Sequence, residues 1–179
     1  MDKTYKMTIA GVERELTLFP VNDKLDIAAF ILFGDVEITI ASAEALLKKV
    51  PEFDVILTPE AKSIPLAYEM ARQCGKPYIV ARKGVKVYMK DAIGVSVNSI
   101  TTQNDQKLYL GSDDADFLKS KKVLIVDDVI STGESLSAVI KLVDAVGGIV
   151  AASCAVLAEG DAANRDDIVF LEPLPLFFK

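Results

Sequence analysis

The sequence predicts an α/β fold built around a parallel, doubly wound sheet, and three observations lead to that prediction. Four short apolar runs have the character of strands that are buried on both faces of a sheet: residues 53–57, 78–81, 123–126 and 149–157. Helical patterns follow two of these runs, over residues 63–74 and 135–146, and each pattern stops at a glycine. Strands that alternate with helices in this way are typical of a parallel sheet covered by helices.

The first fifty residues are predicted to be rich in β-structure and to form an appendage over one end of that sheet. Residues 3–19 alternate between apolar and polar around an Ala-Gly pair, which indicates a β-hairpin. The apolar run at 25–33 predicts another strand, and residues 36–40 alternate as a strand does. A helix over residues 42–50, with Ser42 as its N-cap, would complete this part of the chain.

The segment 84–122 differs from its surroundings because it carries several lysines and a pair of strand patterns. These strands, at 95–102 and 107–110, are joined by Asn104 and Asp105, which predicts a hairpin that projects from the sheet. Connections of this kind lie on the surface and are more mobile than the elements that they join. We therefore expect a partly mobile loop here.

Length and composition predict one domain over residues 1–179, with the appendage at 1–50 and the core at 51–171. The chain has 179 residues, of which 51% are hydrophobic and 26% are charged, as is ordinary for a globular protein with a sizeable core. Towards its end, a polar loop at 159–167 leads to a last short strand at 168–171.

Charge and residue usage exclude several classes of function. The net charge of −6 offers no basic surface, so we expect neither a nucleic acid nor a membrane as a partner. No apolar run is long enough to span a bilayer, and the polar N-terminus lacks the apolar segment of a secretory signal, so we expect a cytoplasmic protein. Cys74 and Cys154 are too isolated for a disulfide framework or a metal site. The chain has no histidine, which excludes Ser-His-Asp and Cys-His catalysis and His-based zinc sites.

One stretch, at residues 123–135, combines the features of a ligand site: VLIVDDVISTGES. An apolar strand runs into the adjacent carboxylates of Asp127 and Asp128, and a small, hydroxyl-rich turn then leads into a helix. Ligands of open α/β sheets bind outside the carboxyl ends of the strands, and the N–H groups at a helix start bind phosphate. The stretch therefore predicts a sugar-phosphate site, with diol hydroxyls or a metal ion on the aspartates and a phosphate on the turn.

Other phosphate-binding classes fit the sequence less well. Receiver domains also open with an apolar strand and paired acids, but they need a further aspartate at the end of a later strand and a lysine after it. No aspartate that follows Asp128 stands at the end of an apolar strand. The chain also lacks the G-x-x-x-x-G-K-[ST] and G-x-G-x-x-G signatures of P-loop and dinucleotide-binding proteins.

The stretch resembles the phosphoribosyl-pyrophosphate signature of the type I phosphoribosyltransferases. Most members carry a Gly-Gly-Thr ending or a similar one, whereas here Glu134 stands in place of the second glycine. The resemblance implies the fold of that family, in which the appendage is a hood over the base and the hairpin is a flexible catalytic loop. It implies that Asp127 and Asp128 hold the ribose hydroxyls, directly or through Mg²⁺ and its waters. The implied 5-phosphate-binding residues are Ser131, Thr132, Gly133, Glu134 and Ser135.

Two further segments resemble the pyrophosphate-binding parts of the family. The loop at 60–63 reads Glu-Ala-Lys-Ser, with lysine in place of the arginine of the adenine enzymes; an ordinary strand-to-helix loop with a serine cap is the alternative. The strand at 78–81 ends in Arg-Lys, as in the adenine and xanthine enzymes, and a solvated strand end is an equal alternative. Lys86, in the expected flexible loop, is assigned a catalytic role by the resemblance. The implied pyrophosphate-binding residues are Glu60, Ala61, Lys62, Ser63, Arg82 and Lys83.

The implied reaction transfers a phosphoribosyl group from phosphoribosyl pyrophosphate to a purine base, with Mg²⁺ as the cofactor and pyrophosphate as the leaving group. Hypoxanthine-guanine enzymes carry an aspartate at the position of Ser131, so adenine is expected first and xanthine next. An enzyme for another base, such as orotate, and a non-catalytic regulator that binds phosphoribosyl pyrophosphate stay open as alternatives.

A homodimer is also expected. The resemblance implies one, and an exposed apolar C-terminal tail would need cover. The apolar residues of that tail are Leu174, Leu176, Phe177 and Phe178.

Overall fold

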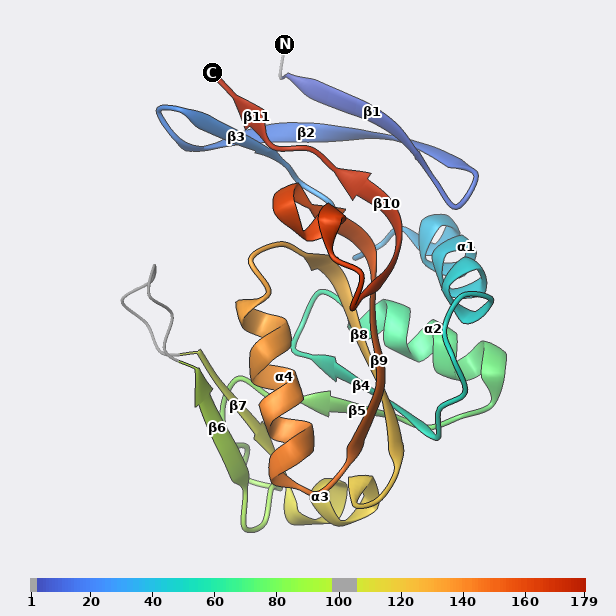
Figure 1. Cartoon of the computed structure of the whole chain (residues 1–179), viewed down its shortest axis with the longest axis vertical. Coiled ribbons are helices and arrows are strands. Elements are labelled where there is room, and N and C mark those ends of the chain that lie inside the picture. Colours follow the sequence, from blue (N-terminus) through green and yellow to red (C-terminus); the bar gives the residue numbers. More distant parts are fainter. Residues whose placement is uncertain (1–2, 98–105) are drawn as a thin grey trace.

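The structure is a computed structural model, and it describes residues 3–97 and 106–179. Its core is a five-stranded sheet in the order β10-β9-β8-β4-β5, and every neighbouring pair in it is parallel. Figure 1 shows this sheet below a smaller sheet that carries both chain ends. The predicted α/β class with a parallel sheet is therefore confirmed. The core strands are β4 (Val55–Pro59), β5 (Tyr78–Ala81), β8 (Lys122–Ile130), β9 (Ile149–Glu159) and β10 (Val169–Leu174).

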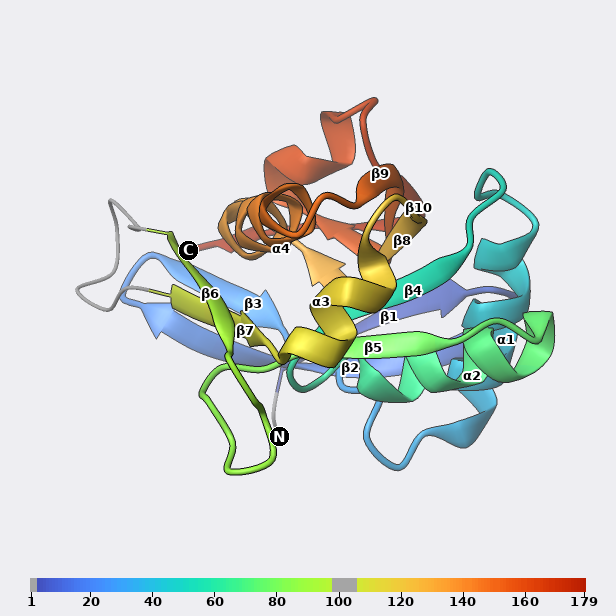
Figure 2. The same ribbon diagram turned by 90° about the horizontal axis from the view of Figure 1, so that it is seen from below.

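Helices cover both faces of the core sheet. On one face, α4 (Glu134–Ala145) packs through Leu136, Val139 and Leu142, which belong to one buried apolar cluster. On the other face, α1 (Val36–Leu47) and α2 (Ile64–Cys74) contribute to a second buried cluster. Figure 2 shows α4 on one side of the strands and the α1–α2 pair on the other. This two-sided burial is the reason that the strands read as nearly continuous apolar runs.

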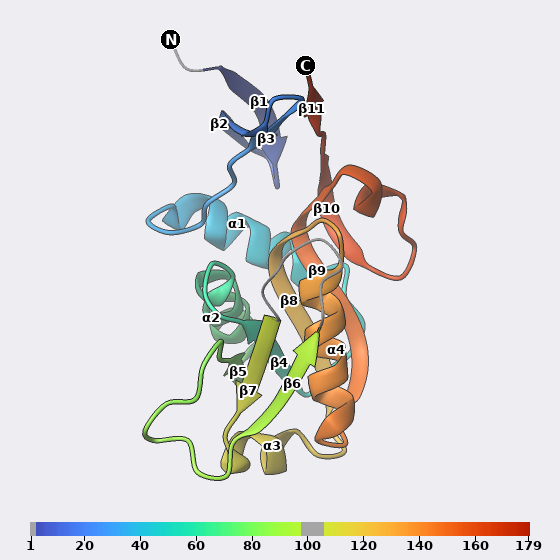
Figure 3. The same ribbon diagram turned by 90° about the vertical axis from the view of Figure 1, so that its left-hand side faces the viewer.

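The smaller sheet, which we call the hood, is antiparallel and takes strands from both ends of the chain, as Figure 3 shows. Its first two strands form the predicted hairpin, and its last strand pairs with the third. Ile9, Leu16 and Ala28 of the hood share one buried cluster with core residues, so the two sheets enclose a common interior. In spatial order the hood strands are β1 (Thr4–Ile9), β2 (Val12–Asn22), β3 (Leu25–Ala28) and β11 (Phe177–Phe178).

The C-terminal tail was expected to be an exposed apolar surface, and the structure corrects this. Leu174 is buried, and the ring of Phe177 packs edge-on against Tyr5 with 5.1 Å between ring centroids. Phe178 alone is largely exposed, at 77%. The tail is covered by the protein's own hood, so it gives no argument for a dimer.

Residues 36–40 were predicted as a strand, which is wrong because they form the first turns of α1. The expected cap Ser42 lies inside the helix and is buried, and the true N-cap is Asp35, whose Oδ1 accepts the N–H of Ile38 at 3.3 Å. Arg14 of the hairpin holds Asp35 in place, with Nε donating to Oδ2 at 2.7 Å. The helix start therefore depends on a contact that spans 21 positions of sequence, which local alternation does not show.

Several boundaries also differ from the prediction. The strand expected at 25–33 ends at Ala28, and the strand expected at 123–126 extends as β8 through the paired acids to Ile130. A short helix that the sequence did not indicate, α3 (Ser112–Leu118), precedes β8 and buries only Ala115 and Leu118.

The predicted hairpin is present as β6 (Ile93–Val97) paired with β7 (Gln106–Leu110). Its expected turn at Asn104 and Asp105, and the strand expected over 98–102, lie outside the described residues. In the polar loop at 159–167, the structure has a 3₁₀ helix, Gly160–Asn164. No helix in the described part of the chain is long and apolar enough to cross a membrane.

Candidate active site

The residues that the sequence singled out gather at the carboxyl ends of the core strands. Strands β8 and β9 run toward the hood, as Figure 3 shows, and β4 runs parallel to β8. The paired acids lie near the end of β8, and the 60–63 loop follows β4. Parallel strands bring their following loops to one edge of the sheet, which is the usual ligand site of such folds. Segments more than sixty positions apart therefore meet here.

The two acids have different surroundings. The Asp128 side chain is only 4% exposed, and its Oδ2 lies 2.8 Å from Nζ of Lys62. Asp127 accepts the N–H of Asp128 on its Oδ1 at 2.9 Å, and no ion pair within the described residues reaches its carboxylate. Burial, together with the neighbouring Asp128, raises the pKa of Asp127 to about 8. The charged form of Asp127 is therefore disfavoured in the free protein, and an added positive charge or further hydrogen-bond donors beside the pair would stabilise it.

Lys62 connects the 60–63 loop with the acidic pair. Its side chain is 55% exposed, so its ammonium group is in contact with both solvent and the buried Asp128. The same ammonium group acts against the effect of burial at Glu159, whose pKa is nevertheless raised. One lysine thus faces carboxylates at the ends of β8 and β9. An anion that binds beside it would meet a cation that is already positioned.

The predicted pyrophosphate residues at the ends of β4 and β5 also lie together. Glu60 accepts the N–H of Lys83 on Oε2 at 2.9 Å, and its Oε1 lies 3.3 Å from Nη2 of Arg82. The Arg82 backbone exchanges two hydrogen bonds with Tyr109 of β7, of 2.9 and 2.8 Å. Glu60 therefore holds the strand end and its basic residues in place, and β7 fixes them from the other side.

Two predicted site residues are placed differently from the rest. The hydroxyl of Ser63 is buried, where it accepts from Oγ1 of Thr58 at 2.7 Å and donates to the Pro59 carbonyl at 3.2 Å, so it serves the loop and not a ligand. Lys86 lies in the connection after β5, where its N–H contacts Sδ of Met89 at 3.3 Å. No ion pair among the described residues joins the Lys86 side chain to the acidic pair.

The turn at 131–135 forms a small hollow of about 130 Å³ with Asp127 at one side. Gly133 adopts a left-handed conformation, with φ of +81°, and it precedes α4 with no side-chain cap on the helix. The first N–H groups of a helix have no partner inside the helix, so this turn presents hydrogen-bond donors to the hollow. The predicted phosphate site is therefore a concave turn at a helix start, directly beside the acidic pair.

A divalent cation fits this donor set only in part. Adjacent carboxylates that already attract an ammonium group suit a hard cation such as Mg²⁺. Among the described residues, however, no group of three or more metal-ligating side chains is present. A metal ion held here by Asp127 and Asp128 would therefore complete its shell with water and with oxygens of a bound ligand, as Mg²⁺ commonly does.

Two residues at this edge were not anticipated from the sequence: Glu159 and Arg165. Glu159 ends β9 and is influenced by the charge of Lys62, while Arg165 lies against Gly133 of the 131–135 turn. Both come from the segment at 159–167, which the sequence presented as an undifferentiated polar loop. Only the proximity of the β8 and β9 ends brings them to the site.

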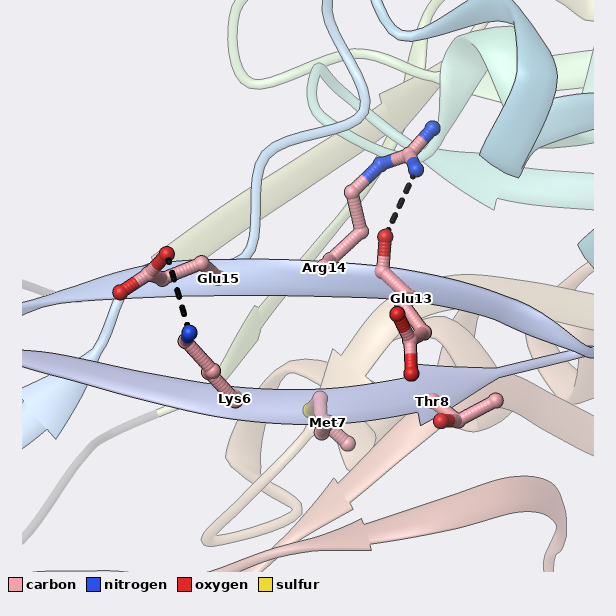
Figure 4. Close-up of a pocket in the computed structure, with 6 residues that line it drawn as sticks. All are labelled: Lys6, Met7, Thr8, Glu13, Arg14 and Glu15. Atoms are coloured by element: carbon pink, nitrogen blue, oxygen red, sulfur yellow. Dashed lines mark hydrogen bonds and ion pairs between the residues drawn. The ribbon is translucent and has the colours of Figure 1, made fainter.

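A larger hollow, of about 420 Å³, lies on the hood hairpin and contains none of the predicted site residues. Figure 4 shows charges of both signs spread along the two strands, with Arg14 pointing away from the hairpin. Lys6 pairs with Glu15 across the strands at 4.0 Å, and both side chains are exposed. Nothing in this hollow converges on a common point, so the strand-end site is the better candidate for chemistry.

Comparison with known proteins identifies the family of the chain. A family model of the phosphoribosyl transferase domain matches residues 36–174. The adenine phosphoribosyltransferase of Thermotoga maritima is 33% identical over 155 residues, covering 82% of this chain and 83% of its own length. The hypoxanthine/guanine phosphoribosyltransferase of Ferroglobus placidus is 32% identical over 114 residues, covering 64% of this chain but only 57% of its own length.

Solved structures show the same fold. The adenine phosphoribosyltransferase of Thermoanaerobacter pseudethanolicus has a TM-score of 0.73 at 22% identity, over 88% of this chain and 95% of its own. The Saccharomyces cerevisiae enzyme, solved with adenine and an imino-altritol bisphosphate, has a TM-score of 0.68 at 16% identity, over 94% and 92% of the two chains. The family match covers most of the core and the whole strand-end site. The chain therefore belongs to the type I phosphoribosyltransferase family and is similar to its adenine enzymes.

Proposed function

We propose that the protein transfers the phosphoribosyl group of phosphoribosyl pyrophosphate to a purine base, giving a nucleoside 5′-monophosphate and pyrophosphate. The observation that carries this proposal is the juxtaposition of the acidic pair, the helix-start turn and Lys62 at one sheet edge. A ribose with a 5-phosphate at one end and a pyrophosphate at the other needs three such groups. The family match supports the donor, and the names of the relatives support a purine as the acceptor.

The residue roles in this proposal follow the geometry. Asp127 and Asp128 hold the ribose 2- and 3-hydroxyls, directly or through Mg²⁺ and its waters. The turn at 131–135 receives the 5-phosphate with its N–H groups, and Lys62, Arg82 and Lys83 face the pyrophosphate. The transition state of such a transfer has oxocarbenium character, so the protein's work is to position the partners and to neutralise the leaving charge. A bound Mg²⁺ would supply further neutralisation of the pyrophosphate.

The base is proposed as adenine first and xanthine next. The adenine enzyme of Thermotoga maritima matches along most of its length, and Ser131 occupies the position at which hypoxanthine-guanine enzymes carry an aspartate. Because the chain also matches enzymes named for hypoxanthine and guanine, these two bases are included in the experiment below.

A panel of bases tests the proposal directly. The protein, Mg²⁺ and phosphoribosyl pyrophosphate are mixed with adenine, xanthine, hypoxanthine, guanine or orotate, and pyrophosphate release is measured. We expect release with adenine. Silence with all five bases would refute the enzymatic proposal, and tight binding of phosphoribosyl pyrophosphate without turnover would favour a regulator instead.

We also propose that the protein is cytoplasmic and that each chain forms a single phosphoribosyltransferase domain. We further propose that two chains form a homodimer through a face on α1 and α2. Val36, Ile40 and Tyr68 are 67%, 43% and 54% exposed, and they surround a hollow of about 220 Å³. Phe33, 55% exposed, lies next to this group in the chain. Apolar surface of this kind is typical of an interaction site. Light scattering at micromolar concentration tests the dimer.

A further inference from the structure

Arg165 lies against the phosphate turn although it comes from the connection between β9 and β10. It directly follows the 3₁₀ helix Gly160–Asn164. A Cβ atom placed on Gly133 would be only 2.6 Å from Nη1 of Arg165, so the guanidinium packs directly on the backbone of the turn. The two residues are brought together only by the fold. Glycine at 133 thus allows the close approach as well as the left-handed φ.

The guanidinium is held by Asp167 in a fixed orientation. Nε donates to Oδ1 at 2.8 Å and Nη2 donates to Oδ2 at 2.7 Å, which is a bidentate pair. The same pair lowers the pKa of Asp167, so it stays charged at neutral pH. Nη1, the nitrogen that faces Gly133, has no hydrogen-bond partner within the described residues. One charged donor is therefore left over beside the turn, on a side chain that is 30% exposed.

The charge around the turn shows what this donor could do. Asp127 and Glu134 both line the hollow, and no lysine or arginine is among its lining residues. The turn itself offers a phosphate its N–H groups and the hydroxyls of Ser131, Thr132 and Ser135. Arg165 adds a positive charge beside this turn from the adjoining loop. A guanidinium is well suited to this task because it stays protonated and presents several donors in one plane.

We propose that Arg165 binds the 5-phosphate of the sugar-phosphate substrate and that Asp167 positions it. The inference rests on the proposed function, because it takes the 131–135 turn as the phosphate site. It adds a residue that lies outside the signature stretch. In this arrangement the β9–β10 connection flanks the phosphate site from the side.

Calorimetric titration of two ligands tests this proposal. Ribose 5-phosphate carries the 5-phosphate but no pyrophosphate, and inorganic pyrophosphate is the reverse. We expect Arg165→Met to weaken ribose 5-phosphate about tenfold, as for the loss of a charged hydrogen bond, with pyrophosphate affinity nearly unchanged. Asp167→Asn should also weaken ribose 5-phosphate and leave pyrophosphate affinity nearly unchanged, but by a smaller factor. Lys62→Met is the matched control, since it should weaken pyrophosphate more than ribose 5-phosphate.

The possible outcomes are distinguishable. If Arg165→Met weakens both ligands equally, or leaves ribose 5-phosphate unaffected, Arg165 is not a phosphate ligand, while the proposed function stands as long as the wild type binds and turns over its substrates. If the wild-type protein fails to bind ribose 5-phosphate at all, the proposed function and this inference fall together. Should Arg165→Met fail to fold in a thermal unfolding check, Arg165→Gln, which removes the charge but keeps a polar side chain, takes its place with the same expected selectivity.

Discussion

Replacing Lys62 with methionine separates its two proposed roles, because it removes the ammonium group and keeps most of the apolar stem. In the ligand-free protein, Lys62 is the counter-ion of Asp128 at 2.8 Å. In the proposed complex, it faces the pyrophosphate. The substitution should therefore destabilise the free protein, weaken pyrophosphate, and strengthen the binding of a metal ion by the acidic pair.

The magnitude follows from the unequal burial of the two partners. Removing one partner of a fully buried pair costs roughly 3–5 kcal/mol, and an exposed pair contributes about 0.2–1 kcal/mol. Asp128 is 4% exposed but Lys62 is 55% exposed, which places this pair between the two cases. We expect a loss of about 1–2 kcal/mol in unfolding free energy, or roughly 2–8 °C in melting temperature for a chain of this size.

The assay is urea unfolding of Lys62→Met, Asp128→Asn and the double variant, followed by titration of each with Mn²⁺ and pyrophosphate. The stability losses should be clearly non-additive, because both changes remove the same contact. Lys48→Met is the matched control: it breaks the exposed Lys48–Glu44 pair and changes the net charge equally. Additive losses, or a Lys62→Met loss no larger than that of Lys48→Met, would refute the assigned ion pair. Unchanged affinity for Mn²⁺ and pyrophosphate would refute its part in the site.

Three other predictions address the sugar site, acid stability and assembly. Asp128→Asn should weaken ribose 5-phosphate by about tenfold or more while far-ultraviolet circular dichroism stays unchanged; unaltered affinity would contradict the role of Asp128. Arg14 lowers the pKa of Asp35, so the Asp35 carboxylate stabilises the fold above the ordinary pKa of 3.8, and that contribution is lost as the pH falls through the lower folded pKa. The stability difference between wild type and Arg14→Met should accordingly be greatest at neutral pH and vanish in strong acid; a difference independent of pH would count against the pair. Val36→Glu should convert the proposed dimer to a monomer in light scattering, whereas Val87→Glu, at a fully exposed position outside the proposed interface, should not.

The sequence alone determined the class of the fold, and it singled out the acidic pair and the turn at 131–135 as one candidate site. The core strands and the helices α2 and α4 were predicted because two-sided burial and helix ends leave local patterns in the residues. The closeness of the acidic pair to the turn at 131–135 could also be predicted, because both belong to one continuous stretch. A strand end and the turn that directly follows it are necessarily close in space.

Tertiary structure decided what depends on distant residues. Asp35 caps the start of α1, and Arg14 fixes the position of Asp35 by a hydrogen bond. The alternation at 36–40 therefore predicted a strand where the structure has a helix. Phe177 and Phe178 form the last strand of the hood, where they pair with β3. In the sequence alone, these residues looked like part of an exposed apolar tail. The Lys62–Asp128 pair and the approach of Arg165 to Gly133 arise because parallel strands bring their carboxyl ends to one edge. Electrostatic partners of this kind are separated by many residues along the chain, so no local pattern in the sequence encodes them.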